Sequence, residues 1–250
     1  MPPSADTIQL TPGAIVGRSR VEALLGVGGT AEVWRVRHLQ LGTPHALKRL
    51  LRSHAIPMRE RLLAEGRAQS RLQHDNILPV RDILDVGGHP ALLLPLIEGP
   101  PLDRLLAAHR PSRDAAVALL AAITRGLSVV HDAGLVHRDL KPANVMLDLR
   151  AGVVQPRVGD FGIARDADNR RTVGGIGMGT PRYAAPEQLR DAAGVDHRAD
   201  FYSLGVVLVE LLTGGCEPVV DGLSTGPLRD LAARLLQRDP AARPPDCAAI

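Results

Sequence analysis

Aromatic residues are scarce in this sequence: Phe, Tyr and Trp together make up 2% of its 250 residues. Its core must therefore be packed mainly with Leu, Val, Ala and Ile. The composition, with 45% hydrophobic and 23% charged residues, excludes a disordered or fibrous chain. The length suits one large domain or two small lobes that share a cleft.

Cysteines are also few, and neither positive nor negative charge dominates. Cys216 and Cys247 are far apart and form no C-x-x-C pair, which argues against a disulfide scaffold or a zinc site and favours a reduced, cytoplasmic protein. The net charge of +3 results from 30 basic and 27 acidic residues. This surplus is too small to indicate a nucleic-acid partner.

Long hydrophobic runs are absent as well. The most apolar stretch, residues 204–212, contains Glu210 and is much shorter than the about 20 residues of a membrane span. It is predicted to be a buried helix. The first residues, MPPSAD, have neither the basic nor the apolar region of a secretory signal. We therefore expect a soluble protein without a membrane partner.

The first hundred residues have the pattern of strands. Residues 1–12 are polar and contain prolines, so we expect a flexible N-terminal tail. The apolar runs that follow are short and broken by glycines or by the turn sequence GGHP, as in strands joined by turns. The predicted elements are three strands within 21–50, one strand around 77–85, one around 91–96, and a helix at 59–72.

The rest of the chain is predicted to be mainly helical. Ser112 can cap a long helix that Gly134 can end, and Pro227 is a good first residue for another. The predicted elements are a helix from Ser112 to about Asp132, a loop-rich middle at 134–190, a buried helix at about 198–213, and a helix from Pro227 to before Pro240. The crevice between two such lobes is a natural ligand site.

A glycine-rich turn, GVGGTAEV at residues 26–33, lies between two of the predicted strands. Small residues let backbone amides approach and cover phosphates. Ala31 replaces the third glycine of G-x-G-x-x-G, and a glycine-rich turn alone is often just a hairpin. Since the turn opens no helix, a Rossmann site is disfavoured, and the absence of G-x-x-x-x-G-K-[ST] disfavours a P-loop NTPase.

Lys48 follows at the end of the third predicted strand. It is either an ordinary solvated lysine or one that is held by a carboxylate. Glu65, on the predicted helix, is placed where it could reach back to Lys48. A lysine held in this way can present its ammonium group to the α- and β-phosphates of a nucleotide.

The most informative segment is HRDLKPAN at residues 137–144. Pro142 argues against a continuous helix, so this is a loop that presents polar groups. Asp139 can accept the proton of an incoming hydroxyl, and Lys141 can neutralise charge on a transferred phosphoryl group. Asn144 can supply a neutral oxygen to Mg²⁺. Each residue alone would fit an ordinary capped loop, but together they indicate phosphoryl transfer.

Two further tripeptides follow in the order that such chemistry requires. In DFG at 160–162, Asp160 would bridge Mg²⁺ to the β- and γ-phosphates, Phe161 would pack inward, and Gly162 would permit a backbone turn. APE at 185–187 closes the segment that begins at Asp160.

With these motifs the sequence resembles the eukaryotic-type serine/threonine protein kinases, especially their bacterial branch, in which A-P-E is followed by Gln188. The resemblance extends from about residue 12 to 244. It implies an α+β, bilobal protein-kinase-like fold with a five-stranded antiparallel N-lobe and one helix at about 13–96, and a mainly helical C-lobe with a shortened C-terminal part at about 97–250. It also implies ATP, Mg²⁺ (or Mn²⁺), and protein Ser or Thr hydroxyls as acceptors in signal transduction.

The resemblance assigns roles to individual residues. Adenine would lie on the hinge at 94–97, with Leu94 as gatekeeper, and Glu98 would approach the ribose. Lys141 and Thr180 match the serine/threonine rather than the tyrosine pattern. The residues implied for ATP are Gly26, Val27, Gly28, Val33, Ala46, Lys48, Leu94, Pro95, Ile97, Glu98, Met146 and Asp160. Asn144 and Asp160 would hold the metal, and catalysis would depend on Asp139, Lys141, Lys48 and Glu65.

Supporting contacts are implied too. His137 is expected to pack beside Phe161 rather than to act as a base. Asp200 would hold the backbone of the H-R-D segment, and Arg243 would pair with Glu187.

One regulatory hypothesis concerns Thr172, the only Ser or Thr between Asp160 and Thr180. Arg138 can clamp a phosphate on this segment. We hypothesise that autophosphorylation of Thr172 within a transient homodimer orders the segment through Arg138. The alternative is an ordinary loop threonine.

The sequence also departs from the family pattern. Pro95 removes one backbone donor from the hinge, although the amide of Ile97 remains. Gln69 places an amide, which needs hydrogen-bond partners, where the family has a small or apolar residue. The family helix that docks substrates has too few residues at 214–228, and the last helix is cut short at Ile250. We expect a trimmed substrate-docking face.

Two other functions stay open. A pseudokinase, or nucleotide-binding scaffold with little transfer activity, is favoured by the trimmed C-lobe but disfavoured by Lys48, Asp139, Asn144 and Asp160. A small-molecule phosphotransferase is disfavoured by Lys141 and the A-P-E segment.

Overall fold

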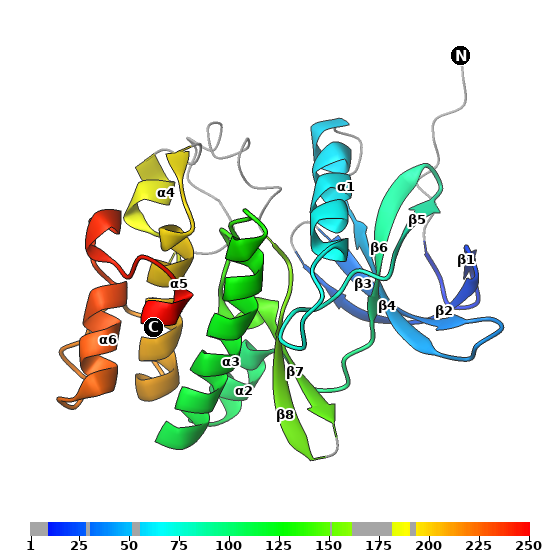
Figure 1. Cartoon of the computed structure of the whole chain (residues 1–250). Coiled ribbons are helices and arrows are strands. Elements are labelled where there is room, and N and C mark those ends of the chain that lie inside the picture. The colour runs from blue at the N-terminus through cyan, green and yellow to red at the C-terminus, as the bar shows by residue number, and fades with distance from the viewer. Residues whose placement is uncertain (1–9, 29–30, 52–55, 151, 162–181, 191–193) are drawn as a thin grey trace. The chain divides into compact units, whose positions relative to one another are not determined.

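The computed structural model describes residues 10–28, 31–51, 56–150, 152–161, 182–190 and 194–250 (Figure 1). The chain divides into two compact units. The first comprises Met1–Arg71 and Pro79–Leu96, and the second comprises Leu72–Leu78 and Ile97–Ile250.

The first unit is an antiparallel sheet with one helix. Its elements are β1 (Ile15–Val16), β2 (Ser19–Val27), β3 (Ala31–His38), β4 (Pro44–Leu50), α1 (Ile56–Ser70), β5 (Asp82–Val86) and β6 (His89–Pro95). The strand order is β1-β2-β3-β4-β6-β5. The five expected strands are present, and the two-residue β1 adds a sixth.

Alternating burial shows which face of this sheet is the core. Trp34 and Val36 of β3 are buried with Leu47 of β4 and Leu93 of β6, as expected where side chains alternate between the two faces of a strand. Leu10, which the sequence places in the N-terminal tail, is buried in the same cluster.

The strand expected around 77–85 is wrong at its start, since β5 begins only at Asp82. The backbone before it is bonded elsewhere: the N–H of Val158 donates to the carbonyl of Asn76 (2.9 Å), and the N–H of Leu78 donates to the carbonyl of Val158 (2.8 Å). Pro79 has no N–H with which to continue a strand. Residues 72–78 therefore belong to the second unit.

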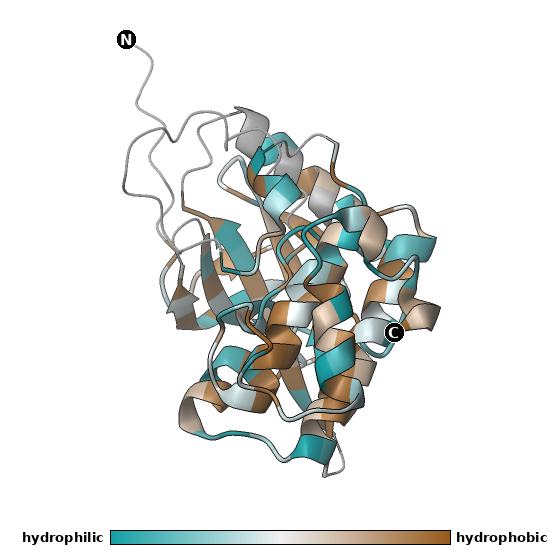
Figure 2. Ribbon diagram, turned by 90° about the vertical axis from the view of Figure 1, so that its left-hand side faces the viewer, coloured by the Kyte–Doolittle hydropathy of each residue, from teal (hydrophilic) through white to brown (hydrophobic). Residues whose placement is uncertain are grey.

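The second unit is mainly helical. Its elements are α2 (Leu102–Ala108), α3 (Arg113–Asp132), a 3₁₀ turn (Pro142–Asn144), β7 (Val145–Arg150), β8 (Val153–Val158), α4 (Pro186–Arg190), α5 (Arg198–Thr213), α6 (Pro227–Leu235) and the 3₁₀ turns Pro240–Ala242 and Cys247–Ala249. α3 packs on α5, and α5 packs on α6 (Figure 1). Apolar residues recur along these helices (brown in Figure 2) and form one core with the β7–β8 hairpin.

The ends of α3 and α5 are those that the sequence predicts, whereas α1 covers residues 56–70 rather than the expected 59–72. The Ser112 side chain accepts a hydrogen bond from the N–H of Ala115 (3.2 Å) and caps α3. α5 ends at Gly214, whose φ of 80° few other residues tolerate. No helix occurs between α5 and α6, in residues 214–226, all of which the structure describes.

The prediction of a loop-rich middle is wrong at two places, because β7 and β8 form a hairpin and α4 a short helix. α2 was not predicted either.

Among the described residues one helix, α3, is long and apolar enough to cross a membrane, with 20 residues and a mean hydropathy of 1.4. Half of this stretch is buried within the unit, and Ile123 and Leu127 lie in its core. Core helices of soluble proteins meet the same criteria, so this feature is weak support for a membrane span.

Candidate active site

The backbone of the H-R-D segment is held by one buried carboxylate. Asp200 of α5 is fully buried. Its oxygens accept hydrogen bonds from the N–H groups of His137 and Arg138, both at 2.8 Å, and Nε2 of His131 lies 2.8 Å from Oδ2. Arg138 has a φ of 64°, which is unfavourable outside glycine and persists where the surroundings enforce it. The expected role of Asp200 is confirmed.

His137 is a packing residue, as expected. Its ring is fully buried and lies 4.8 Å from the ring of Phe161, centroid to centroid. Burial lowers the pKa of His137, against the opposing effect of Asp200 and other nearby acceptors. A neutral imidazole has one donor and one acceptor. These match its two contacts, with the carbonyl of Gly159 at 3.1 Å and the N–H of Asp139 at 3.2 Å.

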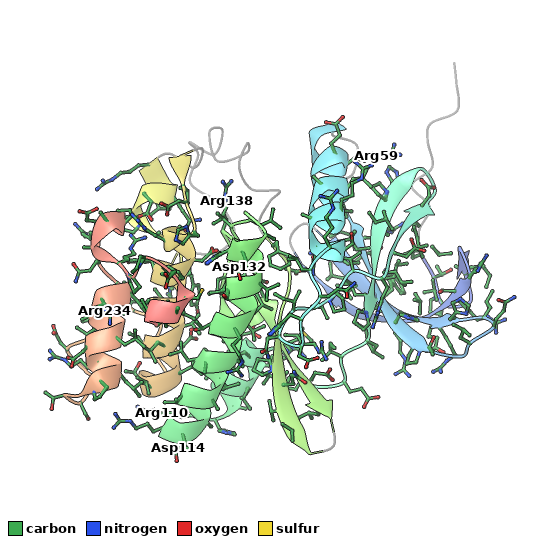
Figure 3. All side chains as sticks on the ribbon, viewed as in Figure 1. Arg59, Arg110, Asp114, Asp132, Arg138 and Arg234 are labelled. Atoms are coloured by element: carbon green, nitrogen blue, oxygen red, sulfur yellow. The ribbon has the colours of Figure 1, made fainter. Side chains whose placement is uncertain are left out.

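Two polar side chains of the same loop, Lys141 and Asn144, bind the side chain of Asp139. Nζ of Lys141 lies 2.9 Å from Oδ2 of Asp139. Nδ2 of Asn144 donates to the same oxygen at 3.1 Å and to the Asp139 carbonyl at 2.8 Å. The side chain of Asp139 is 17% exposed, so it is shielded yet reachable. Arg138, on the other side of it in sequence, lies beyond the C-terminal end of α3 (Figure 3).

The β7–β8 hairpin brings Asn144 and Asp160 together. Val145 and Val158 are register partners, the N–H of Gly159 donates to the Asn144 carbonyl at 2.9 Å, and Nδ2 of Asn144 lies 3.5 Å from the carbonyl of Asp160. Asp160 has a φ of 56°, a second enforced backbone conformation.

Asn144 and Asp160 fit a divalent cation. All hydrogen bonds of the Asn144 side chain to the described residues are donated by Nδ2, so its Oδ1 and the Asp160 carboxylate can offer the hard oxygens that Mg²⁺ prefers. The described residues contain no cluster of three or more His, Cys, Asp or Glu for a metal. Mg²⁺ is usually bound by one or two carboxylates plus substrate phosphates, so two ligands are sufficient.

The A-P-E segment is fixed from two sides. Arg243 forms a bidentate pair with Glu187, at 2.5 and 2.8 Å, which confirms the expected pair. Gln188 accepts from the N–H of Ala185 (2.9 Å) and donates from Nε2 to the carbonyl of Arg138 (3.0 Å). Gln188 thus ties this segment to the H-R-D loop. The sequence singled out Gln188 but did not indicate this contact.

In the first unit, Ala46 and Lys48 share a face of β4. Ala46 lies opposite Leu94 of β6, and Lys48 lies opposite Val33 of β3. Pro95 ends β6. The side chain of Glu65 lies outside the described residues, so its pairing with Lys48 stays a prediction.

The glycine-rich turn joins β2 to β3. Gly26, Val27 and Gly28 are exposed, and the N–H of Gly28 donates to the carbonyl of Ala31 at 2.7 Å. A Cβ atom added at Gly26 would meet nothing within 4 Å, and one at Gly28 would meet only the Ala31 oxygen at 3.5 Å. Neither glycine has a positive φ, so packing and backbone geometry do not require glycine at either position.

The other expected site residues divide into two groups. Ile97, Glu98 and Met146 belong to the second unit, where Glu98 is exposed and Met146 lies on β7. Thr172 and Thr180 lie outside the described residues.

Known proteins are similar to this chain in both sequence and fold. The protein kinase domain family matches residues 19–222. The chain belongs to the protein kinase family. This kinase is 41% identical, over 219 residues, to the DNA damage-responsive serine/threonine-protein kinase RqkA of Deinococcus radiodurans, a match that covers 82% of the chain and 31% of RqkA. It is 39% identical to the serine/threonine-protein kinase PknL of Mycobacterium tuberculosis over 201 residues, 79% of the chain and 49% of PknL.

The fold agrees with these relatives. The kinase domain of M. tuberculosis PknI superposes with a TM-score of 0.75 at 28% identity, over 96% of this kinase and 95% of that chain. The resemblance to bacterial serine/threonine kinases and the α+β fold class are thereby confirmed. The kinase spans less than half the length of RqkA and PknL.

Proposed function

We propose that this kinase transfers the γ-phosphoryl group of ATP to Ser and Thr hydroxyls of proteins, with Mg²⁺ or Mn²⁺ as the cation, in signal transduction. The observation that carries the proposal is the grouping of Asp139, Lys141 and Asn144 on one loop, beside Asp160. Sequence relatives that are named serine/threonine kinases support the same reaction.

Asp139 would accept the proton of the incoming hydroxyl while its oxygen attacks phosphorus. The two donors to Oδ2, Lys141 and Asn144, orient the carboxylate for this task. The charge of Lys141 would also offset negative charge on the transferred group. Such catalysis works mainly through positioning and charge neutralisation.

Oδ1 of Asn144 and the carboxylate of Asp160 would hold the cation, which neutralises phosphate charge when it is bound. Lys48, held by Glu65, would contact the α- and β-phosphates, and Gly26 and Gly28 would let backbone amides approach them. The remaining contacts with the nucleotide would come from Val27, Val33, Ala46, Leu94, Pro95, Ile97, Glu98 and Met146.

Regulation would act through the segment that contains Thr172. We propose that a second copy of the kinase phosphorylates Thr172 in a transient homodimer, and that Arg138 then binds the phosphate. Thr180 would face the protein substrate.

The test is phosphate incorporation from labelled Mg-ATP into the kinase and a generic protein acceptor, with the modified sites mapped by mass spectrometry. Asp139→Asn should reduce transfer by roughly 10²–10⁴-fold, the usual contribution of a positioned base. Asp132→Asn is the matched control, because Asp132 is an exposed aspartate on α3 (Figure 3). Label on Thr172, with activity reduced in Thr172→Val, would support the regulatory step.

Three outcomes contradict the proposal. Equal labelling by the wild type and Asp139→Asn would show that Asp139 is not the base. Tight ATP binding without transfer would indicate a scaffold. Transfer to sugars or antibiotics but not to protein would indicate a small-molecule phosphotransferase.

A further inference from the structure

A cavity lies in the helical unit, far from the H-R-D loop. It has a volume of about 310 Å³ and is formed by the α2–α3 connection, the C-terminal end of α5 and the start of α6. Its walls include Arg110, Arg113, Arg229, Leu211, Leu223 and Ser224. We call it the arginine pocket. The pocket lies at the first residue of α3, and the H-R-D loop follows the last residue of this helix. Because α3 has 20 residues and is therefore about 30 Å long, the two sites are far apart.

The three arginines of this pocket form no ion pair with the described residues. None of the lining residues is a carboxylate. Across the part of the chain that the structure describes, Arg110 and Arg113 form no side-chain hydrogen bond or ion pair, and Arg229 donates only from Nε to the carbonyl of Val220 at 3.4 Å. Asp114 lies at the same end of α3 as Arg110 (Figure 3), but among the described residues it forms an ion pair with neither Arg110 nor Arg113. Asp114, Asp221 and Asp230 stand next to lining residues in sequence but do not line the pocket themselves, so the charged groups that face the hollow are the three cations, which attract anions.

The start of α6 adds a second, independent feature. Its N-cap is Gly226, which provides no side-chain acceptor, and Pro227 is the first helical residue. The first N–H groups of a helix have no acceptor within the helix, and the dipole makes this end positive. Leu228 and Arg229 of this first turn line the pocket. Donors that no side chain caps therefore lie in the wall of the pocket that the three arginines also line, as at anion-binding helix ends.

We propose that the arginine pocket binds a phosphoserine or phosphothreonine side chain of a protein, and so docks a substrate or product that already carries a phosphate. The inference rests on the proposed function, since the transfer reaction generates these groups. A phosphate monoester has a charge of about −1.5 to −2 and three strong acceptor oxygens, and arginine forks bind it in bidentate fashion. Leu223 and Leu228, which are half-buried in the pocket wall, offer apolar contacts to the adjoining peptide.

Size and position agree with a docking role. The volume is at the low end for ligand pockets and suits a side chain with its neighbours. The pocket also includes residues of 214–228, where the sequence is too short for the family's substrate-docking helix. A phosphate-specific contact would supply another way to hold a protein substrate.

The test is fluorescence polarisation with a labelled peptide of the sequence Ala-Leu-pSer-Leu-Ala, its unphosphorylated form, and the form with Asp in place of pSer. The phosphopeptide should bind about tenfold tighter than either, because serine carries no charge and aspartate offers one charge and two acceptor oxygens where the phosphate offers nearly two charges and three. Arg113→Gln and Arg229→Gln should each weaken its binding about tenfold. Arg104→Gln, the same change at an exposed arginine of α2 outside the pocket, should bind as the wild type does.

Equal affinity for the three peptides would overturn the inference, as would equal weakening by Arg104→Gln. If inorganic phosphate displaced the labelled phosphopeptide at the same concentration as the unlabelled phosphopeptide does, the pocket would be a site for free anions. This result would also overturn the inference. Binding is measured without ATP and repeated in Asp139→Asn, so it does not depend on transfer. Peptide binding without transfer would therefore count against the proposed function alone, and transfer without phosphopeptide binding would count against the arginine pocket alone.

Discussion

The H-R-D loop and the glycine-rich hairpin both carry kinase motifs, but they are held in different ways. The loop at 137–144 is fixed by side chains from other elements, with Asp200 of α5 beneath its backbone and Gln188 bonded to its Arg138 carbonyl. In the hairpin at 26–33, Gly26, Val27 and Gly28 are exposed and the N–H of Gly28 donates to the carbonyl of Ala31, while the side chain that another strand contributes, Arg49 of β4, binds Glu32 rather than these glycines.

This difference follows from what each segment would do. Phosphoryl transfer depends on placing the base and the metal ligands accurately, and an unfavourable backbone conformation, such as that of Arg138, persists only where its surroundings enforce it. A segment that covers phosphates needs backbone amides that can approach the ligand. Burial would hinder that approach.

The largest expected effect tests whether the loop depends on Asp200. In Asp200→Ala the buried N–H groups of His137 and Arg138 and the ring of His131 lose their acceptor, which should lower the free energy of unfolding by about 3–5 kcal/mol. Far-ultraviolet circular dichroism reports mainly on the helical second unit. Trp34, the single tryptophan, is buried in the first unit, so its fluorescence reports on that unit.

We expect the helical signal of Asp200→Ala to lose more stability than the Trp34 signal. Asp200→Asn retains one acceptor oxygen and should be intermediate, and Asp132→Asn, on the surface of α3, should match the wild type. Equal losses in both signals would mean that the two units unfold together, and the contrast between their supports would no longer hold.

The next effect concerns pH. Burial lowers the pKa of His137 in the folded state, so the unfolded state binds more protons between this value and the ordinary pKa of about 6.5. Stability should therefore fall as pH decreases below about 6.5, by at most about 1.4 kcal/mol per pH unit. His137→Phe should be less stable at pH 7.5, because it loses two hydrogen bonds, but the difference from wild type should shrink towards pH 5.5.

His45 of β4 serves as the comparison from the other unit. Burial also lowers its pKa, but less of its ring is buried, so His45→Phe should flatten the pH dependence less than His137→Phe does. Urea unfolding at several pH values measures both. An unchanged slope in His137→Phe would show that this histidine is not the group that titrates.

Features with local signals could be predicted from the sequence. Ser112 and Gly134 marked the ends of α3, and the apolar run at 204–212 marked α5. The support of the H-R-D loop by Asp200 and the Arg243–Glu187 pair were predicted through the family resemblance, because these residues stand at fixed places in a recognisable motif series.

Features that depend on distant partners were missed. β8 contains Pro156 and the buried Arg157, which pairs with Asp148 of β7 at 2.8 Å, so neither strand reads as a simple apolar run, although the intervening Gly152 was a turn signal. α2 has only 7 residues, too few for a clear period. The arginine pocket joins three separate segments, each of which reads alone as a solvated surface.

The smallest effect on stability is expected for Gly28→Ala, which should instead change the binding of ATP. An added Cβ has room there and the φ is not positive, so Gly28→Ala should change the free energy of unfolding by less than about 1 kcal/mol. A small increase in stability is expected, because alanine lowers the conformational entropy of the unfolded chain. If the backbone of this hairpin approaches a phosphate closely, the added Cβ should hold the phosphate away and raise the KM for ATP roughly tenfold, the equivalent of one charge-assisted hydrogen bond to a neighbouring amide. Gly42→Ala is the inverse control: Gly42 has open space but a φ of 68°, so this variant should lose about 1–2 kcal/mol and leave the KM for ATP unchanged. If Gly28→Ala instead lost stability as Gly42→Ala does and bound ATP normally, the glycine would serve the hairpin itself, and its contrast with the firmly supported H-R-D loop would have no functional meaning.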